Sequence, residues 1–220
     1  MPNNALTIAF TGEGVTDERF LPNIIQRTAE ELLMEYGKGI IEVYPVMNLG
    51  REAHPEGDIY GAAVRAEGYH LLVVHRDADH RDEEKALKYS IRPSVEKIQL
   101  AKGDLCRTLV PIIPVRMTEA WLMADKDLLR AELRTNLSLK ELGLHRSPEQ
   151  YANPKQVIEQ ALRIAQADQS KRRRNLRIGS LYEPFSLKIP LPKLFQLPSY
   201  RAFYGRLRAK LEELQYLTAS

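Results

Sequence analysis

Three carboxylates in this sequence have the residue types and the spacing that metal-assisted chemistry requires. Glu13 stands between two glycines, and Asp77 and Asp79 form an Asp-x-Asp pair. Hard cations such as Mg²⁺ and Mn²⁺ prefer oxygen ligands, and side chains two residues apart in an extended segment point the same way. The glycines beside Glu13 would also let backbone or a phosphate come close. The three side chains therefore predict a Mg²⁺ or Mn²⁺ site without cysteine or histidine ligands.

Alternating strand and helix patterns must bring these carboxylates together. Residues 6–10 and 71–75 predict apolar strands that end just before Glu13 and Asp77. Strands separated by helix-length connections pair in parallel, and ligands bind beyond the carboxyl ends of such a sheet. The remaining predictions for this half are strands at 40–46 and 109–115 and helices at 16–37 (broken near Pro22), 58–66 and 83–101 (interrupted near Pro93).

The predicted fold class is α/β, a three-layer sandwich with a mainly parallel four-stranded sheet. Continuous apolar strands favour this class, because a parallel sheet covered on both faces does not alternate in polarity. We expect residues 1–125 to form this domain and residues 126–220 to form a mostly helical, basic extension packed on it. One or two helical segments are expected at 117–130, across this boundary. Further helices are expected at 154–167 and 200–216, with the proline-containing segment 176–198 extended or irregular.

Composition excludes several classes of protein. The 220 residues are 44% hydrophobic and 28% charged, which is typical of a globular chain rather than a disordered or fibrous one. The longest apolar runs are too short to span a bilayer, and Met1 to Asn4 lack the basic and apolar segments of a secretory signal. Cys106 is the single cysteine, so no internal disulfide can form. We expect a cytoplasmic protein without membrane contact.

Charge is distributed unevenly along the chain. The first 150 residues hold 19 Lys/Arg and 24 Asp/Glu, whereas the rest hold 13 Lys/Arg and 5 Asp/Glu. An acidic first part of the chain is suited to binding metal, and a basic second part is suited to binding a polyanion. Nucleic acid is therefore the predicted partner. The candidate nucleic-acid-binding residues are Lys171, Arg172, Arg173 and Arg174. The alternative is an ordinary solvated basic surface.

The combined motifs resemble the TOPRIM domain, which topoisomerases, primases and overcoming-lysogenization-defect nucleases share. The chain is more similar to a bacterial TOPRIM-like family, domain of unknown function 4276, near the RloB-like proteins. The similarity covers residues 5 to about 170. The residues that carry it are Gly12-Glu13-Gly14-Val15-Thr16-Asp17, Asp77-Ala78-Asp79, Pro114 to Asp125 and Asn153-Pro154-Lys155, of which Glu-x-Trp-Leu-x-x-Asp at 119–125 and Asn-Pro-Lys at 153–155 are the more specific.

This resemblance implies a TOPRIM/Rossmann-like fold and a Mg²⁺- or Mn²⁺-dependent nuclease that acts in antiviral defence. Glu13, Asp77 and Asp79 would hold the metal, and Glu13 could serve as general base. Glu119 would join the acidic cluster, and Lys155 would neutralise phosphate charge. An ATPase partner subunit is also implied by association, and a homo-oligomer stays open.

Ordinary interpretations remain for each motif. Gly-Glu-Gly is usually a turn, and Asp-x-Asp is usually a solvated loop. Trp121 is expected in the core, and Asp125 is expected to cap the helix that follows it. The alternative functions are a non-catalytic partner-binding subunit of a defence system and a metal-dependent nucleotide or sugar-nucleotide transferase. A metallo-β-lactamase site is rejected, because the later histidine ligands and the β-sandwich that it needs are missing.

Overall fold

Four parallel strands form the centre of the fold, in the order β4-β2-β5-β6. The structure is a computed structural model, and it describes residues 4–167 and 176–218. The four strands are β2 (Ile8–Thr11), β4 (Met47–Asn48), β5 (Leu71–His75) and β6 (Leu109–Ile112), and a separate parallel pair consists of β1 (Ala5–Leu6) and β3 (Glu42–Val43). The predicted α/β class with a mainly parallel four-stranded sheet is confirmed.

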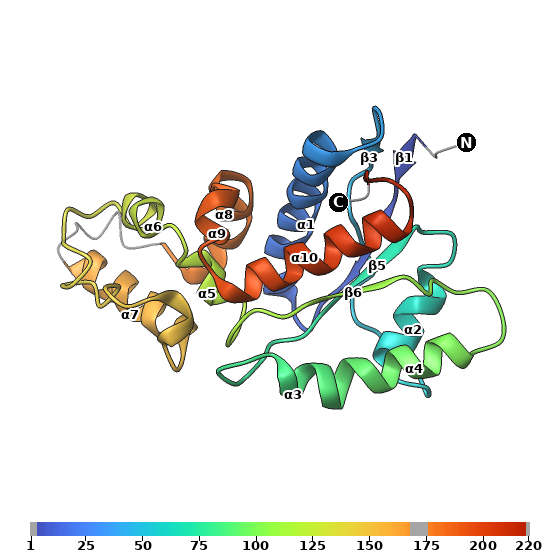
Figure 1. Cartoon of the computed structure of the whole chain (residues 1–220). Helices are drawn as coiled ribbons and strands as arrows, with labels where there is room; N and C mark the ends of the chain where they lie inside the picture. Colours follow the sequence, from blue (N-terminus) through green and yellow to red (C-terminus); the bar gives the residue numbers. More distant parts are fainter. Residues whose placement is uncertain (1–3, 168–175, 219–220) are drawn as a thin grey trace.

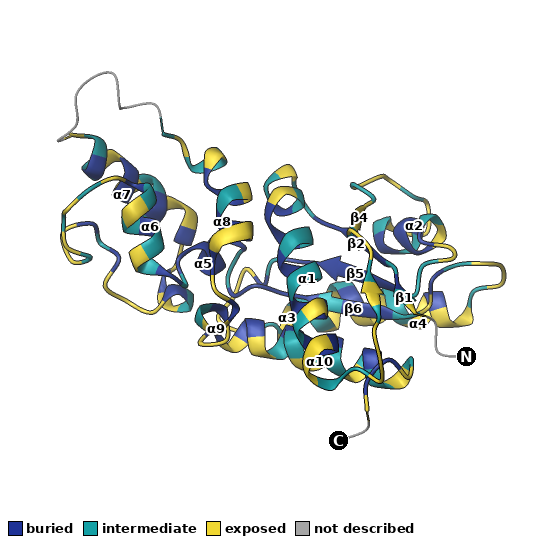
Figure 2. Cartoon of the chain, turned by 90° about the horizontal axis from the view of Figure 1, so that it is seen from above, coloured by how far each residue is buried: buried dark blue, intermediate teal, exposed yellow. Residues whose placement is uncertain are grey.

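Helices cover both faces of this sheet (Figure 1). On one face, Phe10 and Val73 pack with the apolar sides of α1 (Val15–Tyr36) and α10 (Pro198–Glu213). On the other face, Ala9, Leu72 and Val74 pack with α2 (Asp58–Arg65) and α4 (Arg92–Leu100). Successive strand residues point to opposite faces, so alternate residues of β2 and β5 belong to one apolar cluster and the residues between them belong to the other. β2 and β5 are buried beneath these helices, whereas the edge strand β4 is exposed (Figure 2).

The register of the sheet brings two of the predicted site segments together. β2 and β5 are adjacent, with Thr11 paired to Val74, and β5 is adjacent to β6, with His75 paired to Ile112. Because the strands are parallel, the chain leaves all three strands at the same edge. The segments that follow Thr11, His75 and Ile112 therefore meet at the carboxyl edge of the sheet.

The second part of the chain contributes the remaining helices. They are α5 (Glu119–Leu122), α6 (Lys126–Glu132), α7 (Pro154–Ala167), α8 (Tyr182–Lys188) and α9 (Leu191–Leu194), with 3₁₀ turns at 148–150 and 178–180. In both views α6 and α7 lie at the end of the molecule away from α2 and α4 (Figures 1 and 2). α8 packs along α1, and α10 packs on β6 within the same core as the sheet. The domain boundary at residue 125 stays a prediction.

The helix expected at 154–167 is confirmed, as is the cap at Asp125. The Asp125 side chain accepts a hydrogen bond of 3.0 Å from the backbone N–H of Leu128. Trp121 is fully buried, and its indole N–H donates to Ser199 Oγ at 2.8 Å. The predictions of the helix and of the cap depended on local sequence, and the prediction that Trp121 is buried depended on side-chain size. Tertiary packing overrode none of the three.

The break expected near Pro22 does not occur. α1 continues from Val15 to Tyr36 with Pro22 inside it, although an interior proline costs a helix about 3 kcal/mol. The buried side chains around it, among them Phe20, Leu21 and Ile24, pack against the sheet. Burial of each such side chain contributes about 1.5–3 kcal/mol, which together exceeds the cost of the proline.

The irregular segment expected at 176–198 is also wrong. This segment forms α8 and α9 and ends where α10 begins. Pro192 and Pro198 lie in the first turns of α9 and α10, where a helix needs no backbone N–H donor. The prolines therefore start helices rather than exclude them.

The helix expected at 83–101 is present but contains a π-helical turn. It consists of α3 (Glu84–Ala86), the π turn η1 (Leu87–Ile91) and α4. In η1 the backbone N–H of Arg92 donates to Leu87 O, five residues earlier. The wider turn comes directly before Pro93, which has no N–H to donate. Such π turns inside helices often occur at functional sites.

Candidate functional site at the carboxyl edge of the sheet

A pocket of about 480 Å³ lies at the carboxyl edge of the sheet. All three predicted metal ligands, Glu13, Asp77 and Asp79, line it. The other lining residues are Arg51, Asp58, Arg76, Ala78, His80, Lys85, Ala86, Tyr89 and Ser90. The pocket thus combines carboxylates with cationic side chains.

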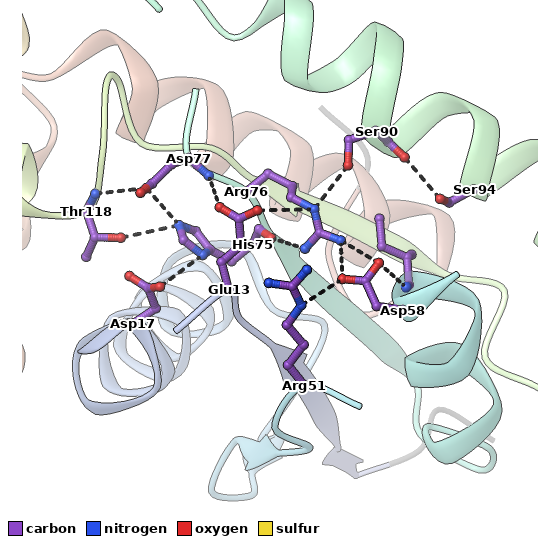
Figure 3. Close-up of polar contacts among 11 residues, drawn as sticks. Glu13, Asp17, Arg51, Asp58, His75, Arg76, Asp77, Ser90, Ser94 and Thr118 are labelled. Carbon is purple, nitrogen blue, oxygen red and sulfur yellow. Dashed lines mark hydrogen bonds and ion pairs between the residues drawn. The ribbon is translucent and has the colours of Figure 1, made fainter. Parts of the chain in front are cut away.

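Glu13 is tied to the loop after β5. Its Oε2 accepts a hydrogen bond of 3.0 Å from the backbone N–H of Asp77, and its Oε1 lies 3.6 Å from Arg76 Nε (Figure 3). Gly12 makes this approach possible, since a Cβ at that position would lie 3.1 Å from the Phe10 ring and 3.3 Å from Asp17 Cβ. The glycine before Glu13 therefore makes room for the protein's own core rather than for a phosphate.

Asp77 joins the ends of β5 and β6. Its Oδ1 accepts from the backbone N–H of Thr118 at 3.1 Å and lies 3.2 Å from His75 Nε2. Burial raises the pKa of Asp77, and the hydrogen bond from His75 opposes that rise. Asp77 Oδ1 is thus held by His75 at the end of β5 and by Thr118 in the segment after β6.

His75 is fully buried between two carboxylates. Asp77 lies on its Nε2 side, and Asp17 Oδ2 of α1 lies 3.6 Å from its Nδ1 (Figure 3). Burial alone would lower the pKa of His75, but the hydrogen bond with Asp77 and the charge of Asp17 outweigh it and raise that pKa. The imidazole therefore links the first turn of α1 to the Asp-x-Asp loop.

Arg76 fixes the opposite wall of the pocket. One guanidinium nitrogen donates to both carboxylate oxygens of Asp58, at 2.8 and 2.7 Å, and Nε donates to Ser90 Oγ at 3.0 Å. Arg51 Nε lies 3.3 Å from the same Asp58 carboxylate. The Arg76 side chain is only 9% exposed, so its pairing satisfies a charge that burial would otherwise make costly.

Asp79 lies at the mouth of the pocket and is exposed. The extended geometry expected for the Asp-x-Asp segment does not hold here, because the φ angle of Asp79 is 55°. Aspartate tolerates this left-handed conformation better than most residues. The backbone N–H of Asp79 donates to Arg116 O at 2.9 Å, which continues the contact between the β5 and β6 segments beyond the sheet.

Glu119 and Lys155 meet each other away from this pocket. Glu119 is buried, its Oε1 accepts a 2.5 Å hydrogen bond from the Tyr182 hydroxyl, and Lys155 Nζ lies 4.0 Å from the same oxygen. Burial and the hydrogen bond to Glu119 raise the pKa of Tyr182. Neither Glu119 nor Lys155 is among the residues that line the pocket. The position of Glu119 four residues after the strand predicted at 109–115 did not indicate this separation.

The carboxylate oxygens of the pocket are suitable ligands for a hard cation, but their present positions do not bring three of them close enough to coordinate one. Within 4–167 and 176–218, no three His, Cys, Asp or Glu side chains lie close enough together to hold a metal ion. A cation would compete with the Asp77 N–H for Glu13 and with Thr118 and His75 for Asp77. Lys171, Arg172, Arg173 and Arg174 lie outside the described residues.

No family model, curated protein or solved structure matches this chain. Over the same described ranges, no helix has the length and apolar character needed to cross a membrane.

Several residues of the site were not predicted from the sequence. Asp17, Asp58, Arg76, Thr118 and Tyr182 each contact a predicted site residue or another residue that does. Arg76 had a signal, since it stands between an apolar strand and the Asp-x-Asp pair. Asp58 had only its place at the start of a helix, which is an ordinary position for an acidic residue.

Proposed function

We propose that this protein is a divalent-metal-dependent phosphodiester hydrolase of nucleic acid, with a TOPRIM-like fold. The observation that carries the proposal is that Glu13, Asp77 and Asp79, from two neighbouring parallel strand ends, line one pocket. Ligand sites of open parallel sheets lie at this edge. Arg51 and Lys85 in the same pocket supply positive charge for a phosphate.

In this proposal different residues bind the metal, accept a proton and position the other side chains. Glu13, Asp77 and Asp79 would hold Mg²⁺ or Mn²⁺, which when bound lowers the pKa of water and neutralises phosphoryl oxygens. Glu13 accepts the proton of the attacking water, because it is the carboxylate that both strand ends hold in place. Arg76 positions Glu13 from the side through the contact between Nε and Oε1. His75 positions Asp77 through their shared contact.

The resemblance to bacterial TOPRIM-like families extends this proposal to antiviral defence with an ATPase partner. A non-catalytic partner-binding subunit and a nucleotide or sugar-nucleotide transferase are the competing functions. Carboxylates from two strand ends in one pocket favour a metal-dependent enzyme over a subunit that only binds partners, since carboxylate oxygens are the ligands that Mg²⁺ prefers. Cleavage of labelled nucleic acid with and without Mg²⁺ distinguishes the three functions.

The metal site is tested by replacing Asp79 with asparagine. We expect Mn²⁺ to bind the wild type and to bind Asp79→Asn at least about tenfold more weakly, because one anionic ligand is lost. Asp79 is exposed, so the buried contacts of Asp77 should persist and the fold should be unchanged. Isothermal titration calorimetry measures the affinity, and circular dichroism checks the fold.

The matched control is Asp104→Asn, which removes an exposed aspartate in the loop before β6, at the opposite edge of the sheet. It should bind Mn²⁺ as the wild type does. Equal affinities for the wild type and Asp79→Asn would remove Asp79 from the metal site.

The basic segment is tested by changing Lys171, Arg172, Arg173 and Arg174 to neutral residues. If all four contact phosphate, the slope of log affinity against log salt concentration should fall in magnitude by up to about three to four units. Fluorescence anisotropy of labelled nucleic acid at several salt concentrations measures this slope. An unchanged slope would mean that these side chains are an ordinary solvated surface.

A further inference from the structure

Tyr89 is an exposed aromatic side chain in the same pocket as the three carboxylates. It is 71% exposed, and it lines the pocket together with Glu13, Asp77 and Asp79. Seven large aromatic side chains of the fold, among them Trp121, Tyr182 and Tyr200, are by contrast fully buried. The pocket therefore presents a solvent-accessible aromatic ring beside the predicted reaction site.

The position of this ring is fixed by the π turn η1. Ser90, the next residue, accepts a hydrogen bond from Arg76 Nε at 3.0 Å, and the Ser94 hydroxyl donates to Ser90 O at 3.0 Å (Figure 3). Arg76 is itself held by Asp58. Because the residue beside Tyr89 is anchored to the buried wall of the pocket, the ring is carried on a defined turn rather than on a free loop.

One lysine lies against the ring, and another lines the same pocket. Lys88 Nζ lies 5.2 Å from the centroid of the Tyr89 ring, and Lys85 Nζ lies 3.1 Å from His80 Nε2 at the pocket. A ring with neighbouring ammonium groups suits a ligand that has both a flat π surface and phosphate, since bases stack on aromatic side chains and phosphates pair with lysine. Nucleotides have this combination.

We infer that the pocket takes single-stranded nucleic acid, with one base stacked on Tyr89 and a neighbouring phosphate directed toward the carboxylates. This inference rests on the proposed function, because a divalent cation held by Glu13, Asp77 and Asp79 would direct the phosphate toward them. Bases of a duplex are already stacked on one another and cannot reach the ring, whereas unpaired bases can. The substrate class is therefore single-stranded DNA or RNA rather than duplex.

The test compares Tyr89→Ala with Tyr89→Phe in full-length protein. Fluorescence anisotropy measures binding of labelled thymidine and uridine oligonucleotides in Ca²⁺, with a duplex and an abasic oligonucleotide of equal length as further probes. We expect Tyr89→Ala to weaken binding of the single strands about 5- to 100-fold, the range for the loss of one stacked base, and Tyr89→Phe to bind as the wild type does. Tyr44→Ala, a change of another exposed tyrosine that does not line this pocket, is the matched control.

The abasic oligonucleotide separates stacking from charge. It keeps the phosphates, so the wild type and Tyr89→Ala should bind it equally, and the duplex should show the same equality. The oligonucleotide whose affinity falls more in Tyr89→Ala shows whether the preferred ligand is DNA or RNA. The inference is overturned if Tyr89→Ala binds the thymidine and uridine oligonucleotides as tightly as the wild type does. It is also overturned if Tyr89→Ala loses as much affinity for the abasic strand as for the strands with bases.

These outcomes are distinguishable from failure of the proposed hydrolysis. Cleavage that needs Asp79 but not Tyr89 would leave the hydrolase in place and remove base stacking. Tyr89-dependent binding by a protein that cleaves nothing would retain the stacking site and remove the hydrolase.

Discussion

Replacing Glu13 with glutamine should lower the single-turnover rate of phosphodiester cleavage by roughly a hundred- to ten-thousand-fold, the usual cost of losing a general base. Glutamine keeps the size of the side chain, and its amide oxygen can still accept from the backbone N–H of Asp77. The amide cannot accept a proton at neutral pH. It also loses the charge that faces Arg76 Nε at 3.6 Å. The chemical step should therefore fail while the pocket keeps its shape.

The measurement is single-turnover cleavage beside an equilibrium binding assay on the same oligonucleotide. At a Mg²⁺ concentration that fills the site despite the lost anionic ligand, binding should change little, because the groups proposed to contact base and phosphate remain. Glu96→Gln, which makes the same change on an exposed part of α4, should cleave at the wild-type rate. Undiminished cleavage by Glu13→Gln would remove the general-base role.

Replacing Trp121 with alanine should lower the free energy of unfolding by about 3–5 kcal/mol, the usual cost of removing a large buried aromatic side chain. The indole is fully buried, contacts Tyr200 edge to face with 5.3 Å between ring centroids, and donates to Ser199 Oγ. Alanine would leave a cavity where α5 meets the start of α10. A loss of this size is a large share of the stability of an ordinary domain.

Urea unfolding followed by circular dichroism measures this change, with Leu100→Ala as the control. Leu100 is 86% exposed at the end of α4, so its removal should alter the free energy of unfolding by less than about 0.5 kcal/mol. If Trp121→Ala unfolds at the same urea concentration as the wild type, the indole does not stabilise the core as its burial indicates.

Three of the four strands and the carboxyl edge of the sheet could be predicted because local sequence determines them. The strand expected at 40–46 instead forms β3, which pairs with β1 outside the four-stranded sheet, and the edge strand is β4. β5 is a run of five buried residues, and such a run followed by Asp77 predicts a strand end with a carboxylate beyond it. The parallel order follows from helix-length connections, so the proximity of Glu13 and Asp77 also follows. The helix at 154–167 was predictable because its apolar residues repeat at helical spacing.

The rest depended on contacts between distant residues. Glu119 follows β6 closely, yet its partners Tyr182 and Lys155 come from α8 and α7, and no local pattern specifies that meeting. The same holds for Asp58, which reaches Arg76 across the sheet edge. Pro22 and Pro198 were misread for a related reason, since the effect of a proline depends on its place in a helix and on what the helix buries.

The packing of α10 on β6 has a consequence for how this gene product can be shortened. α10 is the last helix of the chain, yet it covers the face of the sheet to which Phe10, Val73 and Ile112 belong. A fragment that stopped near residue 125 would present that apolar face to water, and such surfaces aggregate. Residues as far as α10 must therefore leave the ribosome before this face of the sheet is covered, and recombination that exchanged α10 alone would have to supply a helix of matching shape.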